Sequence, residues 1–289
     1  MSAITVQGVQ FFNSATSCID QFENTSRTYK IYSYIQSFGT FFAYLFDKVA
    51  LIWHRVETQM ASFTRAPSEG FSKQRLIVCM HGLNNNPVQF KKIFDEMQKR
   101  DLSETNVYIP YILQKGNAKL DDMVRPIFAE IVKWAQNQDK KELVLVGISN
   151  GGRIAQAIEA ELIKSDQMTN LSQLRVVSIV GACRGSILVD LLHRLHLSWL
   201  LSRNIAEEMS TDSSRNKQLD QDFATGSSKS VNLKCTYTRI ASPHDWQVPN
   251  YNSTLIETPK HPALYAIVPG HGHNSIVNAV AKAVVERIF

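Results

Sequence analysis

A serine lies between two glycines at the point where an apolar run gives way to a helical pattern. In the stretch LVLVGISNGG, Ser149 stands between Gly147 and Gly151, which completes the pattern G-x-S-x-G. Such glycines allow a sharp strand-to-helix turn without side-chain clashes, and the turn leaves the serine hydroxyl exposed. A tight turn that merely needs glycine is the alternative reading. The motif predicts nucleophilic catalysis by Ser149 if a base and a carboxylate follow in the chain.

A histidine and an aspartate that could activate this serine lie further along the chain. Asp245 follows the apolar run LKCTYTRI, and His273 lies between the last strand-like run and the last helical pattern. A histidine base would take the serine proton, and the carboxylate would orient the imidazole ring. His271 is the alternative base. Asp190, or a backbone carbonyl, competes with Asp245 for the orienting role.

Acyl transfer also needs N–H donors for the oxyanion that forms on the attacked carbonyl. The Asn150 N–H is one candidate, because it opens the helix after the serine, where free N–H groups and the helix dipole favour negative charge. The other donor is expected from the sequence His81-Gly82-Leu83-Asn84, which follows the apolar run LIVCM. Leu83 is the preferred residue there and Asn84 the alternative.

A metal site is the competing use of the histidines. His261, His271 and His273 could gather around zinc, but H-x-H alone is unspecific, and neither H-E-x-x-H nor C-x-x-C accompanies it. Serine chemistry already uses one of these histidines. We therefore expect neither a metal nor an organic cofactor, because the serine, histidine and aspartate supply nucleophile, base and electrostatics from the protein itself.

Strand-like and helix-like segments alternate from Arg75 to the end of the chain. Apolar runs predict strands at RLIVCMHG, NVYIPYI, LVLV, LRVVSIVGAC, LKCTYTRIAS and PALYAIVPG. Apolar residues at helical spacing predict helices over 90–97, 120–134, 154–162 and 276–288. Repeated β-then-α units imply an α/β fold, with a mostly parallel central sheet flanked by helices on both faces. Ligands then bind at the carboxyl ends of the strands.

The first 70 residues differ in composition from the domain expected over residues 71–289. The stretch from Ile31 to Phe46 carries no charge and is rich in aromatic residues, and its apolar residues recur at helical spacing as far as Ile52. Polar residues interrupt it, whereas a transmembrane span needs about 20 mostly apolar residues. We expect a helical N-terminal extension over residues 1–70. Its residues 31–53 would pack on the main domain, bind a partner or contact a membrane surface peripherally.

Several motifs together resemble the α/β-hydrolase superfamily, especially its lipase and esterase branches. They are HGLNNNP, GISNGG, GACRGS, SPHDWQVP and GHGHNSI, and the resemblance covers Arg75 to Phe289. The chain order Ser, Asp, His is the order expected of that fold. Similar hydrolases commonly carry a small or polar residue two positions after the catalytic histidine. Ser275 meets this pattern for His273, which favours His273 over His271.

The leucine-rich segment 186–210 lies where related hydrolases often insert a lid over the active site. It could line an acyl pocket, or it could pack on the sheet as an ordinary helix. We therefore expect a serine esterase or lipase-like hydrolase that cleaves carboxylic esters, among them lipid or acyl esters, through an acyl-serine intermediate. A thioesterase or an acyltransferase would use the same triad. A catalytically silent hydrolase fold that serves as a binding or membrane-contact module is the third interpretation.

Composition narrows the partners and the compartment. The formal charge of +5 is spread along the chain without a basic stripe, which argues against nucleic-acid binding. The first residues lack a basic region followed by an apolar core, so no secretory signal is evident, and a cytoplasmic or peripheral membrane location is expected. The four cysteines form no C-x-x-C pair, which favours buried thiols.

Overall fold

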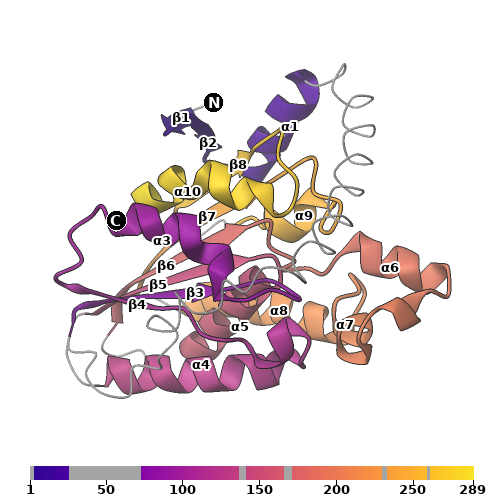
Figure 1. The fold of residues 1–289 in the computed structure, drawn as a ribbon, viewed down its shortest axis with the longest axis horizontal. Coiled ribbons are helices and arrows are strands. Elements are labelled where there is room, and N and C mark those ends of the chain that lie inside the picture. The colour runs from indigo at the N-terminus through magenta and orange to yellow at the C-terminus, as the bar shows by residue number, and fades with distance from the viewer. Residues whose placement is uncertain (1–2, 26–72, 137–140, 166–170, 230–232, 259–260) are drawn as a thin grey trace.

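The computed structural model describes residues 3–25, 73–136, 141–165, 171–229, 233–258 and 261–289 (Figure 1). They form an eight-stranded sheet in the order β1-β2-β8-β7-β6-β5-β3-β4. The strands are β1 (Ala3–Val6), β2 (Val9–Phe12), β3 (Arg75–Met80), β4 (Thr105–Tyr108), β5 (Lys141–Ile148), β6 (Leu171–Ile179), β7 (Lys234–Ala241) and β8 (Ala263–Ile267). Strands β3 to β8 run parallel to one another, and β1 and β2 are antiparallel additions at the β8 edge.

Helices cover both faces of this sheet. The described helices are α1 (Ala15–Thr25), η1 (Pro87–Phe90), α3 (Lys91–Met97), η2 (Leu113–Gly116), α4 (Leu120–Ala135), α5 (Asn150–Lys164), α6 (Ile187–Arg194), η3 (Ser198–Leu200), α7 (Arg203–Glu208), α8 (Ser214–Lys229), α9 (Tyr251–Thr254) and α10 (Ser275–Ile288). Helices α3 and α10 lie on one face, and α4, α5 and α8 lie on the other (Figure 1). The predicted α/β fold, with its parallel strands and flanking helices, is confirmed.

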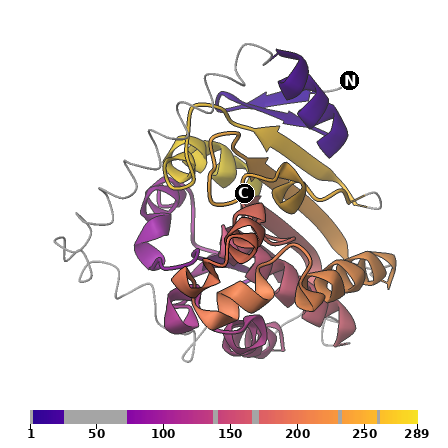
Figure 2. The same cartoon turned by 90° about the vertical axis from the view of Figure 1, so that its right-hand side faces the viewer.

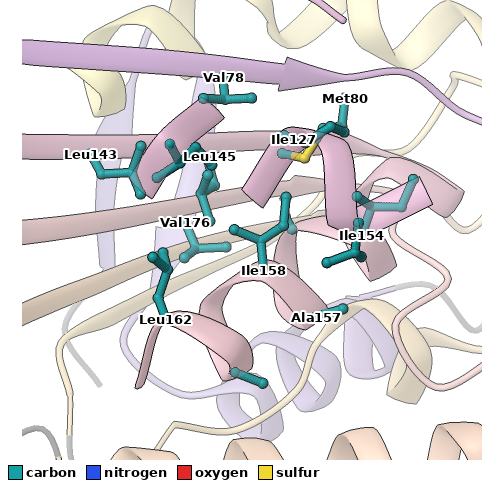
Figure 3. Packing of buried hydrophobic residues seen from close by; sticks show 14 of the residues in the cluster. Val78, Met80, Ile127, Leu143, Leu145, Ile154, Ala157, Ile158, Leu162 and Val176 are labelled. Carbon is teal, nitrogen blue, oxygen red and sulfur yellow. The ribbon is translucent and has the colours of Figure 1, made fainter. Parts of the chain in front are cut away.

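The core forms because the central strands are apolar on both faces. Val78 and Leu145 pack against α4 and α5, where Ile158 meets them (Figure 3). Their sequence neighbours Ile77 and Val144 point to the opposite face, in the cluster that α3 and α10 complete. A strand buried on both faces reads as a continuous apolar run rather than an alternating one. This is why such runs were sufficient to predict the parallel strands.

The N-terminal residues correct one prediction. Residues 3–12 are not helical, because β1 and β2 form a hairpin that continues the sheet, with Phe12 opposite Tyr265 of β8. The hairpin turn is Gln7-Gly8, whose φ angles of 50° and 80° are those of the tight turns that match strand twist. Helix α1 then packs on β8 through the buried Cys18. The helix expected over residues 31–53 lies outside the described residues.

Two further expectations concern cysteines and membranes. All four cysteines, Cys18, Cys79, Cys183 and Cys235, are buried thiols. Burial raises the pKa of the Cys18 thiol to about 12 and removes its reactivity at neutral pH. In the part of the chain that the structure describes, no helix is both long and apolar enough to cross a membrane.

Candidate active site

Ser149 occupies a strained turn between β5 and α5. Its φ of 56° and ψ of −124° lie in a region that residues with a side chain rarely adopt. A Cβ atom on Gly147 would lie 2.3 Å from the Gly151 carbonyl oxygen, and one on Gly151 would lie 1.8 Å from the Met80 carbonyl oxygen. Glycine is therefore required at both positions, because the backbone of the turn passes too close to Gly147, and the β3 backbone too close to Gly151, for a side chain to fit. The Ser149 N–H donates to the Ile179 carbonyl at 3.0 Å, which holds the strained residue in place.

Asp245 and His273 form a buried pair at the same edge of the sheet. Asp245 follows β7, His273 lies between β8 and α10, and the distance from His273 Nδ1 to Asp245 Oδ2 is 2.7 Å. The other carboxylate oxygen, Oδ1, accepts the N–H groups of Gln247 and Val248 at 2.8 and 3.0 Å. An ionised carboxylate can only accept, so Nδ1 carries the proton and Nε2 is left as the basic nitrogen.

The competing assignments for base and acid have other partners. Asp190 accepts hydrogen bonds from the Ser210 and Thr211 hydroxyls at 2.7 and 2.6 Å, so it ties α6 to the residues that follow α7. The backbone carbonyl of His271 accepts the Ser242 hydroxyl. Among the hydrogen bonds of the described residues, Asp245 binds the ring of His273 and not that of His271.

The serine and the histidine are not hydrogen-bonded to each other. Within the described residues no hydrogen bond joins Ser149 Oγ to His273. Both side chains are buried, at 4% exposure each, and both follow the carboxyl ends of parallel strands. Catalytic hydrogen bonds often tighten only when substrate binds, so this geometry is compatible with a serine–histidine pair.

The loop after β3 lies directly against Ser149, and one of the three N–H groups from Gly82 to Asn84 has no acceptor among the described residues. A Cβ atom on Gly82 would lie 2.9 Å from Ser149 Cβ. The Gly82 N–H donates to Gln89 Oε1, and the Asn84 N–H donates to the Lys115 carbonyl, each at 2.8 Å. The Leu83 N–H has no acceptor among the described residues. Of the two residues weighed for this donor, the geometry therefore leaves Leu83.

The Asn150 N–H is similarly placed on the other side of the serine. It opens α5 directly after Ser149, where a helix has no acceptor for its first N–H groups. None of the hydrogen bonds between described residues uses it. Leu83 and Asn150 thus each have an N–H group without an acceptor among the described residues, and two such donors near the nucleophile are what an oxyanion requires.

His81 fixes the direction of the Leu83 N–H. Its Nε2 accepts the Ile112 N–H at 3.1 Å, so the proton sits on Nδ1, which donates to the Gly82 carbonyl at 2.9 Å. That carbonyl and the Leu83 N–H belong to one planar trans peptide and point in opposite directions. Burial lowers the pKa of His81 to about 4, so the ring stays neutral in this arrangement near pH 7. The sequence showed His81 only as the first residue of the motif His81-Gly82-Leu83-Asn84.

The segment 186–210 forms a cap beside the site, composed of α6, η3 and α7. Its inner residues Val189 and Ile205 pack in a small apolar cluster against which Leu83 also rests. The buried Arg153 of α5 holds its end, with Nη2 donating to the Glu208 carbonyl at 3.0 Å. Figure 2 looks onto this end of the molecule, with the cap in front of the carboxyl ends of the strands.

The outer surface of the cap carries four exposed large apolar side chains, at Ile187, Leu191, Leu195 and Trp199. Trp199 is 74% exposed, and the exposed large apolar side chains of the cap recur every four residues. Across the described residues, all but one of the exposed large apolar side chains lie near this end, at Tyr111, Leu113, Ile187, Leu191, Leu195 and Trp199. Exposed apolar side chains therefore gather at this end of the molecule, and we call these six residues the apolar rim.

The described residues also contain a groove that lies away from the candidate site. A groove of about 760 Å³ is lined by residues near the amino ends of β6 and β7, among them Arg175 and Lys234, and includes none of the site residues. No group of three His, Cys, Asp or Glu side chains in the described chain is arranged to hold a metal ion.

Comparison with known proteins identifies the fold. No family model and no curated protein matches the sequence. A lipase from Bacillus licheniformis is 16% identical, with 78% of this chain and 95% of that chain covered and a TM-score of 0.51. Lipase B from Aspergillus fumigatus is 12% identical, with 76% and 53% covered and a TM-score of 0.52. A monoacylglycerol lipase from Paleococcus ferrophilus is 16% identical, with 74% and 93% covered and a TM-score of 0.47.

The chain has the α/β-hydrolase fold. The parallel sheet, the strained serine turn after β5 and the likeness to these solved structures agree on this point. At such low identity the likeness defines the architecture, and the chemistry has to be argued from the residues of this chain.

Proposed function

We propose that the protein is a serine hydrolase that cleaves carboxylic esters. The observation that carries the proposal is the buried His273–Asp245 pair, 2.7 Å apart, at the same sheet edge as Ser149 in its strained turn. A buried imidazole held by a carboxylate, with its basic nitrogen available, is what activation of a serine hydroxyl requires. A binding module without catalytic activity has no need of this combination.

The reaction follows from these positions. Ser149 Oγ attacks the ester carbonyl while its proton passes to His273 Nε2, and the oxyanion accepts hydrogen bonds from the Leu83 and Asn150 N–H groups. The C–O bond to the alcohol breaks, and His273 returns the proton to the leaving oxygen. Water then attacks the acyl-serine with His273 again as base, which releases the carboxylic acid and restores Ser149. Asp245 orients the imidazole throughout.

The substrate that we propose carries an apolar acyl group. The support is the apolar cluster of Val189 and Ile205 on the inner face of the cap, against which Leu83 rests, together with the exposed apolar side chains on the cap and on the segment after β4. In this proposal the cap acts as a lid whose inner face contacts the acyl chain. Lipid esters fall within this class, and short acetyl esters would leave the apolar rim unused.

Hydrolysis of p-nitrophenyl butyrate and p-nitrophenyl palmitate by the wild type and by Ser149→Ala tests the proposal. Loss of the serine costs on the order of a millionfold in turnover in a triad enzyme, so the contrast is large. Ser149-dependent release of p-nitrophenol supports the proposal. Equal rates in the two proteins would contradict it. Adding p-nitrophenyl acetate to this pair tests the apolar-acyl part alone, and a rate that falls steadily from acetate through butyrate to palmitate would contradict that part.

A further inference from the structure

A strained turn follows β4 and lies against the oxyanion loop, which we define as Gly82 to Asn84. Gln114 and Lys115 in η2 have φ angles of 51° and 56°, and the next residue, Gly116, has a φ of 85°. The first two carry side chains, which disfavour this left-handed conformation. Backbone strain persists only where the surrounding contacts over-determine it, and it concentrates at functional sites. Contacts with the candidate active site hold this turn.

The turn contacts both sides of the oxyanion hole. The Lys115 carbonyl accepts the Asn84 N–H at 2.8 Å, which fixes the peptide that follows Leu83. The Gly116 carbonyl accepts the side-chain amide of Asn150 at 3.0 Å. Asn150 is also the residue whose backbone N–H is the second proposed donor. A displacement of the turn would therefore move both donors relative to Ser149.

Asn117, directly after the turn, joins it to the cap. Its side-chain Nδ2 donates to Asn84 Oδ1 at 2.7 Å and to the Gln114 carbonyl at 3.0 Å. Its backbone carbonyl accepts Asn204 Nδ2, from α7 of the cap, at 3.1 Å. One residue thus binds the oxyanion loop, the strained turn and the cap. Sequence reasoning missed it, because the only local signal was a Gly-Asn pair typical of turns.

We propose that Asn117 is a positioning residue that couples the cap to the oxyanion hole. Through Asn204 the cap holds the turn, and through Asn84 the turn holds the Leu83 N–H at the distance from Ser149 that the oxyanion requires. The proposal rests on the proposed ester hydrolysis. It adds that the cap regulates this reaction, because any movement of the cap changes the position of the oxyanion donors as well as access to the site. Substrate binding by the apolar rim does not depend on this coupling.

Two substitutions of Asn117 test the role. Loss of an oxyanion donor costs roughly 10²–10³ in kcat, and a displaced donor costs part of that. We expect Asn117→Ala and Asn117→Asp to lower kcat for p-nitrophenyl butyrate about 10- to 100-fold, with KM changed less than about twofold. Asn117→Asp keeps the side-chain size but has no N–H to donate, so it serves where Asn117→Ala fails to fold. Asn278→Ala, exposed on α10, is the matched control and should keep the wild-type kcat.

A second readout separates positioning from general structural support. A trifluoromethyl ketone forms a hemiketal oxyanion with an active serine, and its inhibition constant should rise in the proportion by which kcat/KM falls. The melting temperature should stay near that of the wild type. Asn204→Ala should lower kcat in the wild-type background and have little further effect in Asn117→Ala, since the two act through one connection.

The outcomes distinguish this proposal from the proposed function. Wild-type kcat and wild-type inhibitor affinity in both Asn117 variants would overturn the positioning role and leave ester hydrolysis standing. A loss of melting temperature that accounts for the lost activity, with unchanged inhibitor affinity, would also overturn it. If neither turnover nor fluorophosphonate labelling of the wild type depends on Ser149, the proposed function fails and no oxyanion remains for Asn117 to serve.

Discussion

Replacing Asp245 with asparagine tests the geometry of the buried pair, because the backbone dictates how the new amide must lie. Asp245 Oδ1 accepts two N–H groups, from Gln247 and Val248. Only an amide oxygen can keep those bonds, so the amide N–H₂ must face His273 Nδ1. That contact favours the tautomer with its proton on Nε2, which cannot accept the Ser149 proton. The fold should survive, since size and backbone contacts are retained.

The expected loss in kcat from Asp245→Asn is about 10⁴-fold, equivalent to about 5 kcal/mol of transition-state stabilisation. The assay is p-nitrophenyl butyrate hydrolysis at pH 7.5, with circular dichroism to confirm folding. Asp190→Asn is the matched control, because Asp190 bonds Ser210 and Thr211 rather than a histidine. A folded Asp245→Asn variant within tenfold of the wild type would refute the reasoning. So would a larger loss in Asp190→Asn than in Asp245→Asn.

Three further predictions follow from burial and steric contact. Gly151→Ala should destabilise the fold by at least about 3 kcal/mol in urea titration, because its Cβ would meet a β3 carbonyl. Gly270→Ala should cost about 1 kcal/mol, because its Cβ would enter open space and only the φ of 85° opposes a side chain. Equal costs would contradict this. Arg153→Met should cost about 3 kcal/mol and speed proteolysis within the cap, because it removes the bonds of the buried guanidinium to Asn216 and Glu208 that hold the end of the cap. Unchanged cleavage would count against it. Burial lowers the pKa of His81 from 6.5 to about 4, so the folded protein binds a proton at His81 less readily than the unfolded chain does. The free energy of unfolding is therefore not reduced by this group above about pH 6.5, and it falls by an amount on the order of 3 kcal/mol as the pH drops toward 4. His81→Gln should show a shallower decline in urea midpoint over that range, and an equal decline would oppose the argument.

The parts of the site that the sequence could predict are those set by local chemistry. The turn at Ser149 needs glycine at 147 and 151 for steric reasons, and that need is visible in the residue types themselves. Strands buried on both faces must be apolar throughout, so β5 and its neighbours could be predicted from their continuous apolar runs. The placement of Asp245 and His273 after strands of one parallel sheet then brings them to a single edge.

The parts that sequence reasoning missed depend on distant contacts. β2 pairs with β8, which lies some 250 residues further along the chain, so nothing local marks β1 and β2 as sheet strands except a short alternation around Gln7-Gly8. The left-handed turn at Gln114 and Lys115 is imposed by its bonds to the oxyanion loop, and neither residue type signals it. The polar run over residues 210–230 has few apolar residues, so its sequence gives little sign of a helix that packs on the core. Much of it is instead α8, which buries Leu219 and Phe223 one helical turn apart.

The most direct test of the central claim is labelling of the folded wild type with a fluorophosphonate, followed by mass spectrometry of the modified peptide. An activated serine attacks the phosphorus and displaces fluoride, whereas an ordinary buried serine does not react. We predict a single adduct on Ser149, a labelling rate strongly reduced in Asp245→Asn, and no adduct in Ser149→Ala. A folded wild-type protein that remains unlabelled, or labelling that persists unchanged in Ser149→Ala, would contradict the account.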